Sequence, residues 1–411
     1  MTMSSTAPAA PRPAGLDQLD AIGLPTKRDE AWRYAPHRRL AELRFGPTVA
    51  SGVDEPLDLD DRLPALDGPR IVIVNGAVDP ERSNLAGSEG LRLSTLAEAA
   101  GAEADLIRHH TDPAQVADAY VALNVAYGTD GAVVEVDPGF EIAAPIHIVD
   151  VTVPGSVTNA SSTGVVVRVG AGSSVTVVES RLGVGTEFGG SNVRTSITLG
   201  DDATLEHIVV QDLPANQVHL GRVEVVQGER STLRTRSFNL GASYGRLDYH
   251  VELAGAGAHA ELSGLFFGVG EQILDQQISV VHRAENCTSR QLFRGVLDDA
   301  STGVFNGGID VCPGADGTDA EQSNDNLLLS NRAEVNTQPR LEILADEVAC
   351  KHGATVGQLD DTALYYLRTR GINADEARRL LINGFADEVV DDVSVETIRN
   401  WITHRLGHDH D

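Results

Sequence analysis

A repeat runs through the middle of this chain and restricts the folds that are open to it. Each copy begins with a turn of small or acidic residues and continues with alternating apolar and polar positions. Aligning the copies on Ser174, Thr204, Thr232, His259 and Thr288 gives steps of 30, 28, 27 and 29 residues. Repeats of roughly 20–50 residues are typical of solenoids and propellers.

The length of the repeat separates these two architectures. Each copy supplies about two short strands, which is one turn of a two-sided β-solenoid, whereas a propeller blade takes about 40 residues and four strands. In a solenoid, inward Val, Leu and Ile side chains stack from coil to coil, and each coil pairs its backbone with the next. Residues 131–343 are therefore predicted to form a parallel β-solenoid.

The segments on both sides of the repeat are expected to cap the solenoid, because its terminal coils expose open strand edges. Residues 1–15 are rich in Ala, Pro, Ser and Thr and are predicted to be a disordered lead-in. Residues 16–130 are predicted to form a mainly helical N-terminal domain, with a short strand from 71 and helical patterning over 91–127. Residues 344–411 are predicted to form a C-terminal helical domain.

Composition and charge argue against binding to nucleic acid or membranes and favour a cytoplasmic location. The formal net charge of −28 disfavours binding to nucleic acid or to an anionic membrane. The sequence has no apolar run of about 18 residues that could span a membrane and no secretory signal pattern. Its three cysteines form no disulfide framework, so the reducing cytoplasm is the expected location.

The segment Cys350–Asp360 (CKHGATVGQLD) holds the most distinctive chemistry in the sequence. Cys350 and His352 are two residues apart, a spacing that places both side chains on one face of a strand. Thiolate and imidazole both bind iron, but two ligands cannot close a metal site. The pair is therefore predicted to be half of a site that another chain completes. Lys351 between them is expected to lower the pKa of the thiol, as a neighbouring cation does.

Several motifs are missing from the sequence. There is no GxxxxGK[ST] loop, so the chain is not expected to hydrolyse ATP itself. It also lacks GxSxG, HExxH and paired CxxC motifs, so it is not expected to hold a complete cluster alone. These observations favour a non-catalytic subunit over an enzyme.

Several motifs in the same order resemble one known family. CKHGATVGQLD, LYYLRTRGI (364–372) and ARRLLINGF (377–385) are similar to the carboxyl end of the SufB/SufD family, and GLPTKRDEAWRY (23–34) and QPRLEILADEV (338–348) agree with it upstream. These are scaffold subunits of the SUF iron–sulfur cluster assembly complex. Gly353 after the histidine is similar to the SufD branch, since SufB usually has Glu there.

This resemblance implies both a fold and partners. The fold is mainly β: a right-handed parallel β-helix flanked by an N-terminal α/β region and a C-terminal α-helical region. The partners are a SufB paralogue, which pairs through the β-helix, and the ATPase SufC, which docks on the C-terminal helices; a homodimer is possible in isolation. A transient iron–sulfur cluster is implied at the interface, bound by His352 and a cysteine of SufB, with Cys350 as a further candidate. A flavin is associated with the complex, but no residue of this chain locates it. The residues expected to dock the ATPase are Tyr365, Tyr366, Leu367, Arg370, Leu381 and Phe385.

Two alternatives remain open at this point. The first alternative to a SufD-type scaffold is a SufB-like paralogue, against which Gly353 argues, and the second is a β-helix polysaccharide lyase or hydrolase. An enzyme of the second kind would use turn-borne acids such as Asp201, Asp202, Asp298 and Asp299. The low aromatic content, 4%, leaves few platforms for sugar rings and favours the scaffold.

Overall fold

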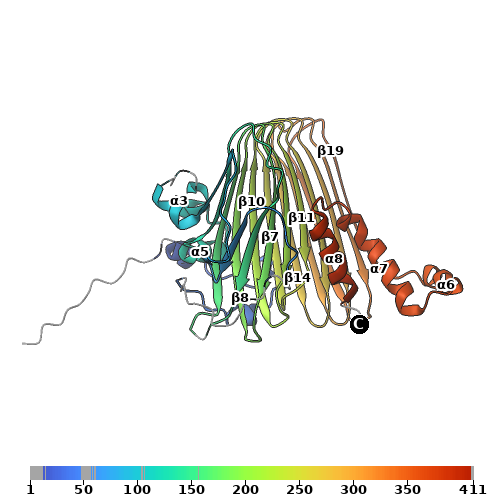
Figure 1. The fold of residues 1–411 in the computed structure, drawn as a ribbon. Coiled ribbons are helices and arrows are strands. Elements are labelled where there is room, and N and C mark those ends of the chain that lie inside the picture. The colour runs from blue at the N-terminus through green and yellow to red at the C-terminus, as the bar shows by residue number, and fades with distance from the viewer. Residues whose placement is uncertain are drawn as a thin grey trace, which may run out of the picture.

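Two long sheets form the body of the molecule, and Figure 1 shows their strands lying side by side. The structure is a computed structural model that describes residues 13, 15–47, 57, 59, 62–102, 105, 107–155 and 157–408. The predicted lead-in, 1–15, therefore lies almost wholly outside the described residues.

The two sheets are called sheet 1 and sheet 2. In spatial order, sheet 1 contains β2 (Ala77–Val78), β1 (Arg70–Val74), β5 (Ile146–Thr152), β7 (Ser174–Gly183), β9 (Thr204–Asp212), β11 (Thr232–Asn239), β13 (His259–Gly268), β15 (Thr288–Leu297), β17 (Asp319–Leu328) and β19 (Ala349–Gln358). Sheet 2 contains β3 (Leu91–Thr95), β4 (Gly131–Val136), β6 (Ala160–Val169), β8 (Gly189–Leu199), β10 (Gln217–Gln227), β12 (Tyr244–Leu253), β14 (Ile273–His282), β16 (Thr302–Val311) and β18 (Glu334–Ile343).

From β4 onward the chain alternates between the sheets, so that two consecutive strands make one coil of a parallel β-solenoid. This confirms the predicted fold class. The register also confirms the alignment of the repeat, because Ser174, Thr204, Thr232, His259 and Thr288 are successive partners along sheet 1. Two further copies, which begin at Asp319 and Ala349, continue the same column.

Apolar ladders run through the interior, as expected for stacked coils. One ladder in sheet 2 has an apolar side chain in every coil, and each member is the register partner of the next: Val134, Val167, Ile197, Val225, Val251, Val280, Ile309 and Leu341. Most of these residues belong to one large buried cluster that spans both sheets. Burial of this continuous apolar surface stabilises the stack at roughly 25 cal/mol per Å².

The interior also holds a buried ionic group that the sequence did not predict. The Glu179 carboxylate accepts hydrogen bonds from Arg181 (2.9 Å), His207 (2.7 Å) and Thr195 (2.8 Å). These side chains come from three strands and are almost fully buried. Although burial opposes ionisation, Arg181 and His207 hold the pKa of Glu179 well below its usual range. A buried charge is tolerated here because it is paired and hydrogen-bonded.

The N-terminal region contributes strands as well as helices. Its helices are α1 (Gly15–Ile22), η1 (Glu30–Trp32), α2 (His37–Leu40), α3 (Leu96–Ala102), α4 (Arg108–Thr111), η2 (Pro113–Gln115) and α5 (Ala119–Tyr127). Strand β1 pairs parallel to β5, and β3 pairs antiparallel to β4, so both sheets extend into this region. Residues 91–95, which were expected to be helical, form β3 instead.

Helices of the N-terminal region cover the outer face of sheet 2. The amide of Asn124 on α5 donates to the backbone oxygens of Thr163 and Asn192, both at 3.0 Å. Trp32 is buried, and the guanidinium of Arg246 lies 3.9 Å from its ring centroid. The conspicuous Asp29–Trp32 motif therefore anchors this layer to the solenoid.

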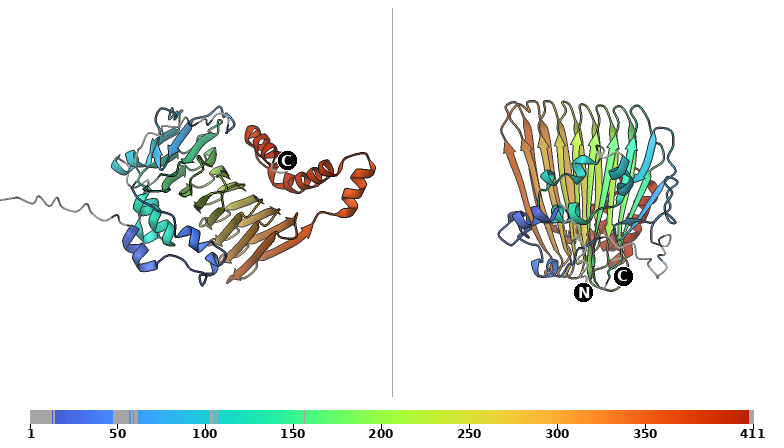
Figure 2. Two further views of the ribbon diagram at one scale, coloured as in Figure 1. Left: turned by 90° about the horizontal axis from the view of Figure 1, so that it is seen from below. Right: turned by 90° about the vertical axis from the view of Figure 1, so that its left-hand side faces the viewer.

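The C-terminal region contains α6 (Asp361–Thr369), α7 (Ala374–Val390) and α8 (Glu396–His408). Helices α7 and α8 lie against the outer face of sheet 1, whereas α6 projects away from the solenoid (Figures 1 and 2). The centre of this contact is apolar, with Ile382, Val389 and Ile402 packed into the cluster that contains Phe238 and Phe267. No helix in the described part of the chain has both the length and the apolar character needed to cross a bilayer.

The solenoid continues past residue 343, where the sequence placed its end. Strand β19 pairs in parallel with β17 over its whole length and is the last strand of sheet 1. The prediction of helix from residue 344 was therefore wrong for these residues, and the helical part starts at Asp361. β19 carries little apolar side chain and is exposed along nearly all of its length, so the alternation that marks the other strands is missing.

Candidate functional site

The Cys–His pair lies on β19, at the open end of the solenoid. Cys350 is the register partner of Ala320, and His352 is the register partner of Gln322. Ala320 and Gln322 are both buried and belong to the interior side of β17. Because side chains alternate along a strand, Cys350 and His352 share this interior side. No further coil follows, so the pair faces the open end of the stack.

The two residues differ in exposure. Cys350 is half-buried and packs against the cluster formed by Ile309, Val311, Ala315 and Ala320. His352 is exposed, which leaves its ring available to an incoming group. The imidazole is therefore the more accessible of the two side chains.

Lys351 does not act on the thiol as expected. It points to the opposite face of β19, where its Nζ forms an ion pair with Glu321 at 2.8 Å. The pKa of Cys350 is raised: burial raises it most, a hydrogen bond with the backbone of Ala320 opposes this, and the Asp319 carboxylate raises it further. The expectation of a lowered pKa was wrong, because alternation along the strand separates the two side chains.

A row of buried amides lies behind His352. Gln322 Nε2 donates to Gln291 Oε1 at 2.7 Å, and Asn326 Nδ2 donates to Asn324 Oδ1 at 2.8 Å. Gln322 Oε1, Asn326 Oδ1 and Thr337 Oγ1 are buried and have no hydrogen-bond partner among the described residues. Buried polar atoms are nearly always satisfied in a complete structure. Buried polar atoms of this kind also occur elsewhere in the interior, so they do not by themselves distinguish this end of the solenoid.

The apolar residues of the last coil are exposed as well. Ile343, Leu344 and Val356 are large hydrophobic residues at the end of the stack, and all three are exposed. Sequence reasoning missed them, because it placed Ile343 at the last position of the solenoid and residues 344 onward in a helical domain. Within the described residues, no group of three or more His, Cys, Asp or Glu side chains is arranged to hold a metal ion.

The predicted docking residues divide into two groups. On the projecting helix α6, Tyr365 and Tyr366 are 69% and 56% exposed. Arg370, directly after the helix, is also exposed, with its guanidinium 5.1 Å from the Tyr366 ring centroid. Leu367 and Leu381 are half-buried. The sequence prediction omitted Leu380, which is also exposed on α7.

Phe385, the last of the predicted docking residues, faces the solenoid. It packs with the cluster between α7 and sheet 1, and the guanidinium of Arg294 lies 4.9 Å from its ring centroid. Its place is therefore in the joint between α7 and the solenoid.

Together these features define a parallel β-solenoid with a cysteine and a histidine at its open end and exposed aromatic residues on an appended helix. Two family models cover most of the chain: the SufBD protein N-terminal region matches residues 2–148, and the SufBD core domain of the SUF system for FeS cluster assembly matches residues 152–385. The chain belongs to the SufB/SufD family of the SUF system of iron–sulfur cluster assembly.

Individual relatives agree with this assignment. The chain is 31% identical to an iron–sulfur cluster assembly SufBD family protein of Synechocystis over 94% of this chain and 88% of the relative. It is 30% identical to the iron–sulfur cluster assembly protein SufD of Escherichia coli over 95% of this chain and 90% of the relative. Identity to SufD of Bacillus subtilis is 28% over 68% of this chain and 64% of the relative.

Proposed function

We propose that this chain is a SufD-type scaffold subunit that shares a nascent iron–sulfur cluster with a SufB paralogue at the open end of its solenoid. The observation that carries the proposal is the position of His352: an exposed imidazole on the interior side of the edge strand β19, beside Cys350. Imidazole and thiolate are both iron ligands. Because the pair is incomplete, the remaining ligands belong to the partner, and we assign a cysteine of SufB to this role.

Within the pair, His352 is the principal ligand. The raised pKa of Cys350 keeps more of its thiol protonated, and a protonated thiol is a poor ligand for iron. A neutral imidazole offers a nitrogen lone pair, and the exposed ring of His352 is open to an incoming group. When a partner covers β19, the cluster that forms there is shielded from bulk water, which protects its labile sulfide.

The C-terminal helices are proposed to dock the ATPase SufC. Exposed aromatic side chains such as Tyr365 and Tyr366 are typical of protein interfaces, because each buries a large area at low entropic cost. Since the sequence has no P-loop, ATP hydrolysis belongs to the partner. Movement of the ATPase would reach the solenoid through α6 and α7, which follow β19 directly in the chain.

The two alternatives are less well supported. Gly353 and the similarity to proteins named SufD argue against a SufB-like subunit. In a glycan-cleaving enzyme, the turn-borne acids would form a catalytic pair. Instead, Asp202 is held by the guanidinium of Arg230 at 2.8 Å, and Asp298 pairs with Arg378 at 2.9 Å. These acids hold turns and the joint to α7 in place.

Co-expression tests the proposed partners. The tagged chain is produced together with the SufB and SufC of its own organism, and we expect it to recover both. Replacing both Tyr365 and Tyr366 with Ser removes exposed aromatic surface and should release SufC while SufB stays bound.

The matched control replaces Ile22 and Leu24, two other exposed hydrophobic residues, with Ser and should retain both partners. Failure of the wild-type chain to recover either partner would contradict the proposed function. Retention of SufC by the Tyr variant would contradict the docking surface alone.

A further inference from the structure

A ladder of alternating charges crosses the outer face of sheet 1. It occupies one position in each of six successive strands, β9 to β19, and each member is the register partner of the next. The sign changes at every step. The members, in order, are Glu206, Arg234, Glu261, Arg290, Glu321 and Lys351.

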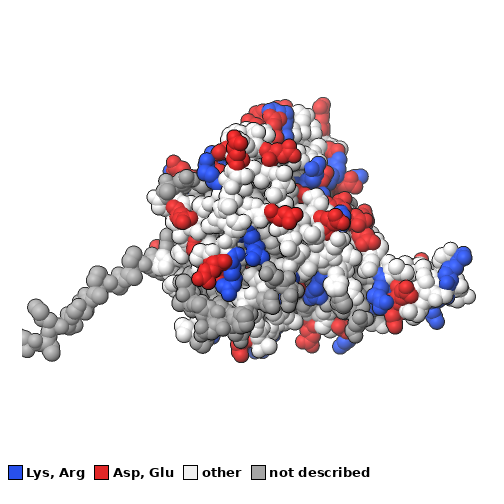
Figure 3. All heavy atoms as spheres, in the orientation of Figure 1, with Lys and Arg blue, Asp and Glu red and all other residues white. Residues whose placement is uncertain are grey.

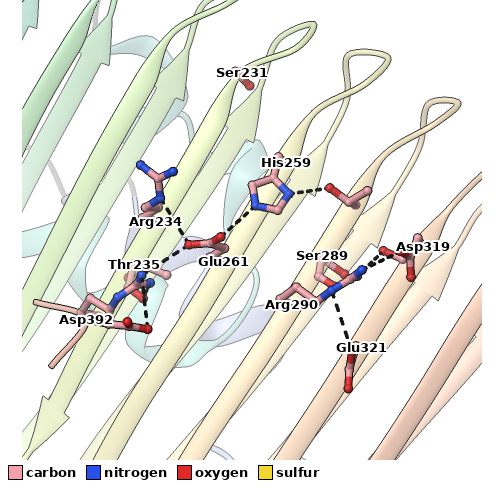
Figure 4. Close-up of polar contacts among 12 residues, drawn as sticks. Ser231, Arg234, Thr235, His259, Glu261, Ser289, Arg290, Asp319, Glu321 and Asp392 are labelled. Carbon is pink, nitrogen blue, oxygen red and sulfur yellow. Dashed lines mark hydrogen bonds and ion pairs between the residues drawn. The ribbon is translucent and has the colours of Figure 1, made fainter. Parts of the chain in front are cut away.

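Several neighbouring members of this ladder are in direct contact. Arg234 Nε lies 3.3 Å from Glu261, Arg290 Nε lies 3.9 Å from Glu321, and Lys351 Nζ lies 2.8 Å from Glu321. Figure 4 shows Arg234 reaching Glu261 and Arg290 reaching Glu321 across adjacent strands. Opposite charges on adjacent strands stabilise a sheet, and like charges in these positions destabilise it. The pattern therefore supports the pairing of each strand with its neighbour.

The groove along this ladder does not have the character of a site for an anion. Its volume is about 640 Å³, and it is lined by Arg234, Arg236 and Arg290, but also by four carboxylates, Glu206, Glu261, Glu321 and Asp392. Arg236 is nearly buried and lies 3.4 Å from Glu261 and 3.9 Å from Asp392. The same mixture of signs appears across the face of the molecule in Figure 3. The arginines of the groove are neutralised by the protein itself.

The two ends of the ladder differ. At the first end, Glu206 accepts hydrogen bonds from the backbone and hydroxyl of Ser394, in the segment between α7 and α8, so its free side is covered. At the other end, Lys351 has Glu321 on one side, and its side chain is 70% exposed. Each member inside the ladder has an oppositely charged register partner on both neighbouring strands. Lys351 has such a partner, Glu321, on one neighbouring strand, β17.

Within the described part of the chain, the strand edge that carries Lys351 is unpaired on one side and lies beside exposed apolar residues, as expected for a contact surface. β19 is the terminal strand of sheet 1 and pairs with β17 on one side. The exposed apolar residues Ile343, Leu344 and Val356 lie at the same end. An edge strand of this kind is a template for another strand.

We infer that a strand of the partner subunit pairs with β19 and places a carboxylate beside Lys351, as the next member of the charge ladder. Lys351 thereby favours one strand and one register, because a one-residue slip removes the opposite charge. A second copy of this chain whose β19 placed its own Lys351 at that position would meet a like charge, which disfavours it. This inference rests on the proposed function, in which the SufB paralogue covers this end.

The sequence makes this inference unusually easy to test, because it contains two lysines, Lys27 and Lys351, among its 32 basic residues. A carbodiimide joins a lysine amine to a carboxylate in contact with it, with loss of one water. In a Lys27→Arg chain, Lys351 carries the single lysine amine. Treatment of the complex of this variant with the paralogue, followed by mass spectrometry of peptides, should yield a crosslink between Lys351 and an Asp or Glu of the partner.

Affinity measurements give an independent result. Lys351→Arg keeps the charge and should bind the paralogue within about twofold of the wild-type affinity, while the crosslink is lost. Lys351→Met removes one ion pair and should weaken binding about threefold, and Lys351→Glu adds repulsion and should weaken it about tenfold or more. The effect of Lys351→Glu should shrink at high salt, since ion pairs at the rim of an interface are screened.

The outcomes separate this inference from the proposed function. If the complex forms, Lys351 crosslinks to Glu321 of its own chain alone and Lys351→Glu binds as tightly as wild type, the inference is wrong and the proposed function stands. If wild-type chain and paralogue form no complex, both are contradicted. Lys351→Met separates weaker binding from a disturbed β19, because it creates no repulsion with Glu321 within the chain, as Lys351→Glu does.

Discussion

Arg294 connects the C-terminal helices to the last coils of the solenoid. Its Nη1 donates to Asp325 on β17 at 2.6 Å, its Nη2 pairs with Glu388 on α7, and its guanidinium lies 4.9 Å from the ring centroid of Phe385. Asp325 also accepts a hydrogen bond from Thr355 on β19. Through Asp325, Arg294 thus links α7 to β19, the strand that carries His352.

The magnitude of its contribution follows from these contacts. The Arg294 side chain is 13% exposed, so the cation–π contact with Phe385 is partly desolvated and contributes about 1 kcal/mol. Glu388 is 55% exposed, which limits that ion pair to about 0.5 kcal/mol. The ion pair of Arg294 with Asp325 joins two strands of the solenoid, so it does not contribute to the attachment of α7. Arg294→Ala should therefore lower the free energy needed to detach α7 by about 1–2 kcal/mol.

Hydrogen exchange measures this loss directly. We expect amide protection over residues 382–390 of α7 to fall about 5- to 30-fold in Arg294→Ala, because each 1.4 kcal/mol is a factor of ten. The matched control is Arg283→Ala, which removes an exposed arginine that pairs with Glu252, away from α7. Unchanged protection of α7 in a folded Arg294→Ala chain would refute this account of the joint.

Three further predictions concern the core and the site. Phe238 is fully buried in the cluster beneath α7 and α8, so Phe238→Ala should lower the unfolding free energy by about 3–5 kcal/mol in urea titrations; a loss below 1 kcal/mol would count against the packing. Burial, and to a lesser extent the Arg70 cation, lowers the pKa of His147 to about 4 from an ordinary 6.5. The folded state therefore favours the neutral ring, which contributes about 3 kcal/mol to the free energy of unfolding above pH 6.5. This contribution is lost as the pH falls from 6.5 toward 4. Urea midpoints of His147→Gln should therefore fall less steeply than wild type over that window, and parallel curves would disprove the assignment. Cys350→Ser should leave more than half of the iron and sulfide bound by the wild-type complex, and complete loss would make Cys350 an essential ligand.

The solenoid was predictable because its coils repeat a local pattern. Turn residues and alternating apolar positions recur in each copy, so aligning Ser174 with Thr204 already placed partners that the structure pairs. The pattern fails at β19, since no coil follows it and its inward positions are not buried. Strand β3 was missed for a related reason: it is a short edge strand that leads directly into α3.

The polar contacts depend on proximity in three dimensions and left no local signal. Glu179, Thr195 and His207 come from β7, β8 and β9, so their meeting in the interior depends on how the two sheets face each other. The position of Lys351 is a different case, since adjacent residues on a strand point to opposite faces and the sequence alone could have separated Lys351 from Cys350. The charge ladder was present in the sequence at the spacing of the repeat, and the register was needed to recognise it.

The most direct test of the central claim is the iron and sulfide content of the His352→Ala complex. The chain is co-expressed with the SufB paralogue and SufC, reconstituted without oxygen, and compared with wild type and with His109→Ala, which alters another exposed histidine far along the chain. We predict that His352→Ala assembles with its partners normally and binds less than about a tenth of the wild-type iron and sulfide, as expected when a required ligand is removed. Wild-type iron and sulfide in His352→Ala would contradict a cluster site at the open end of the solenoid.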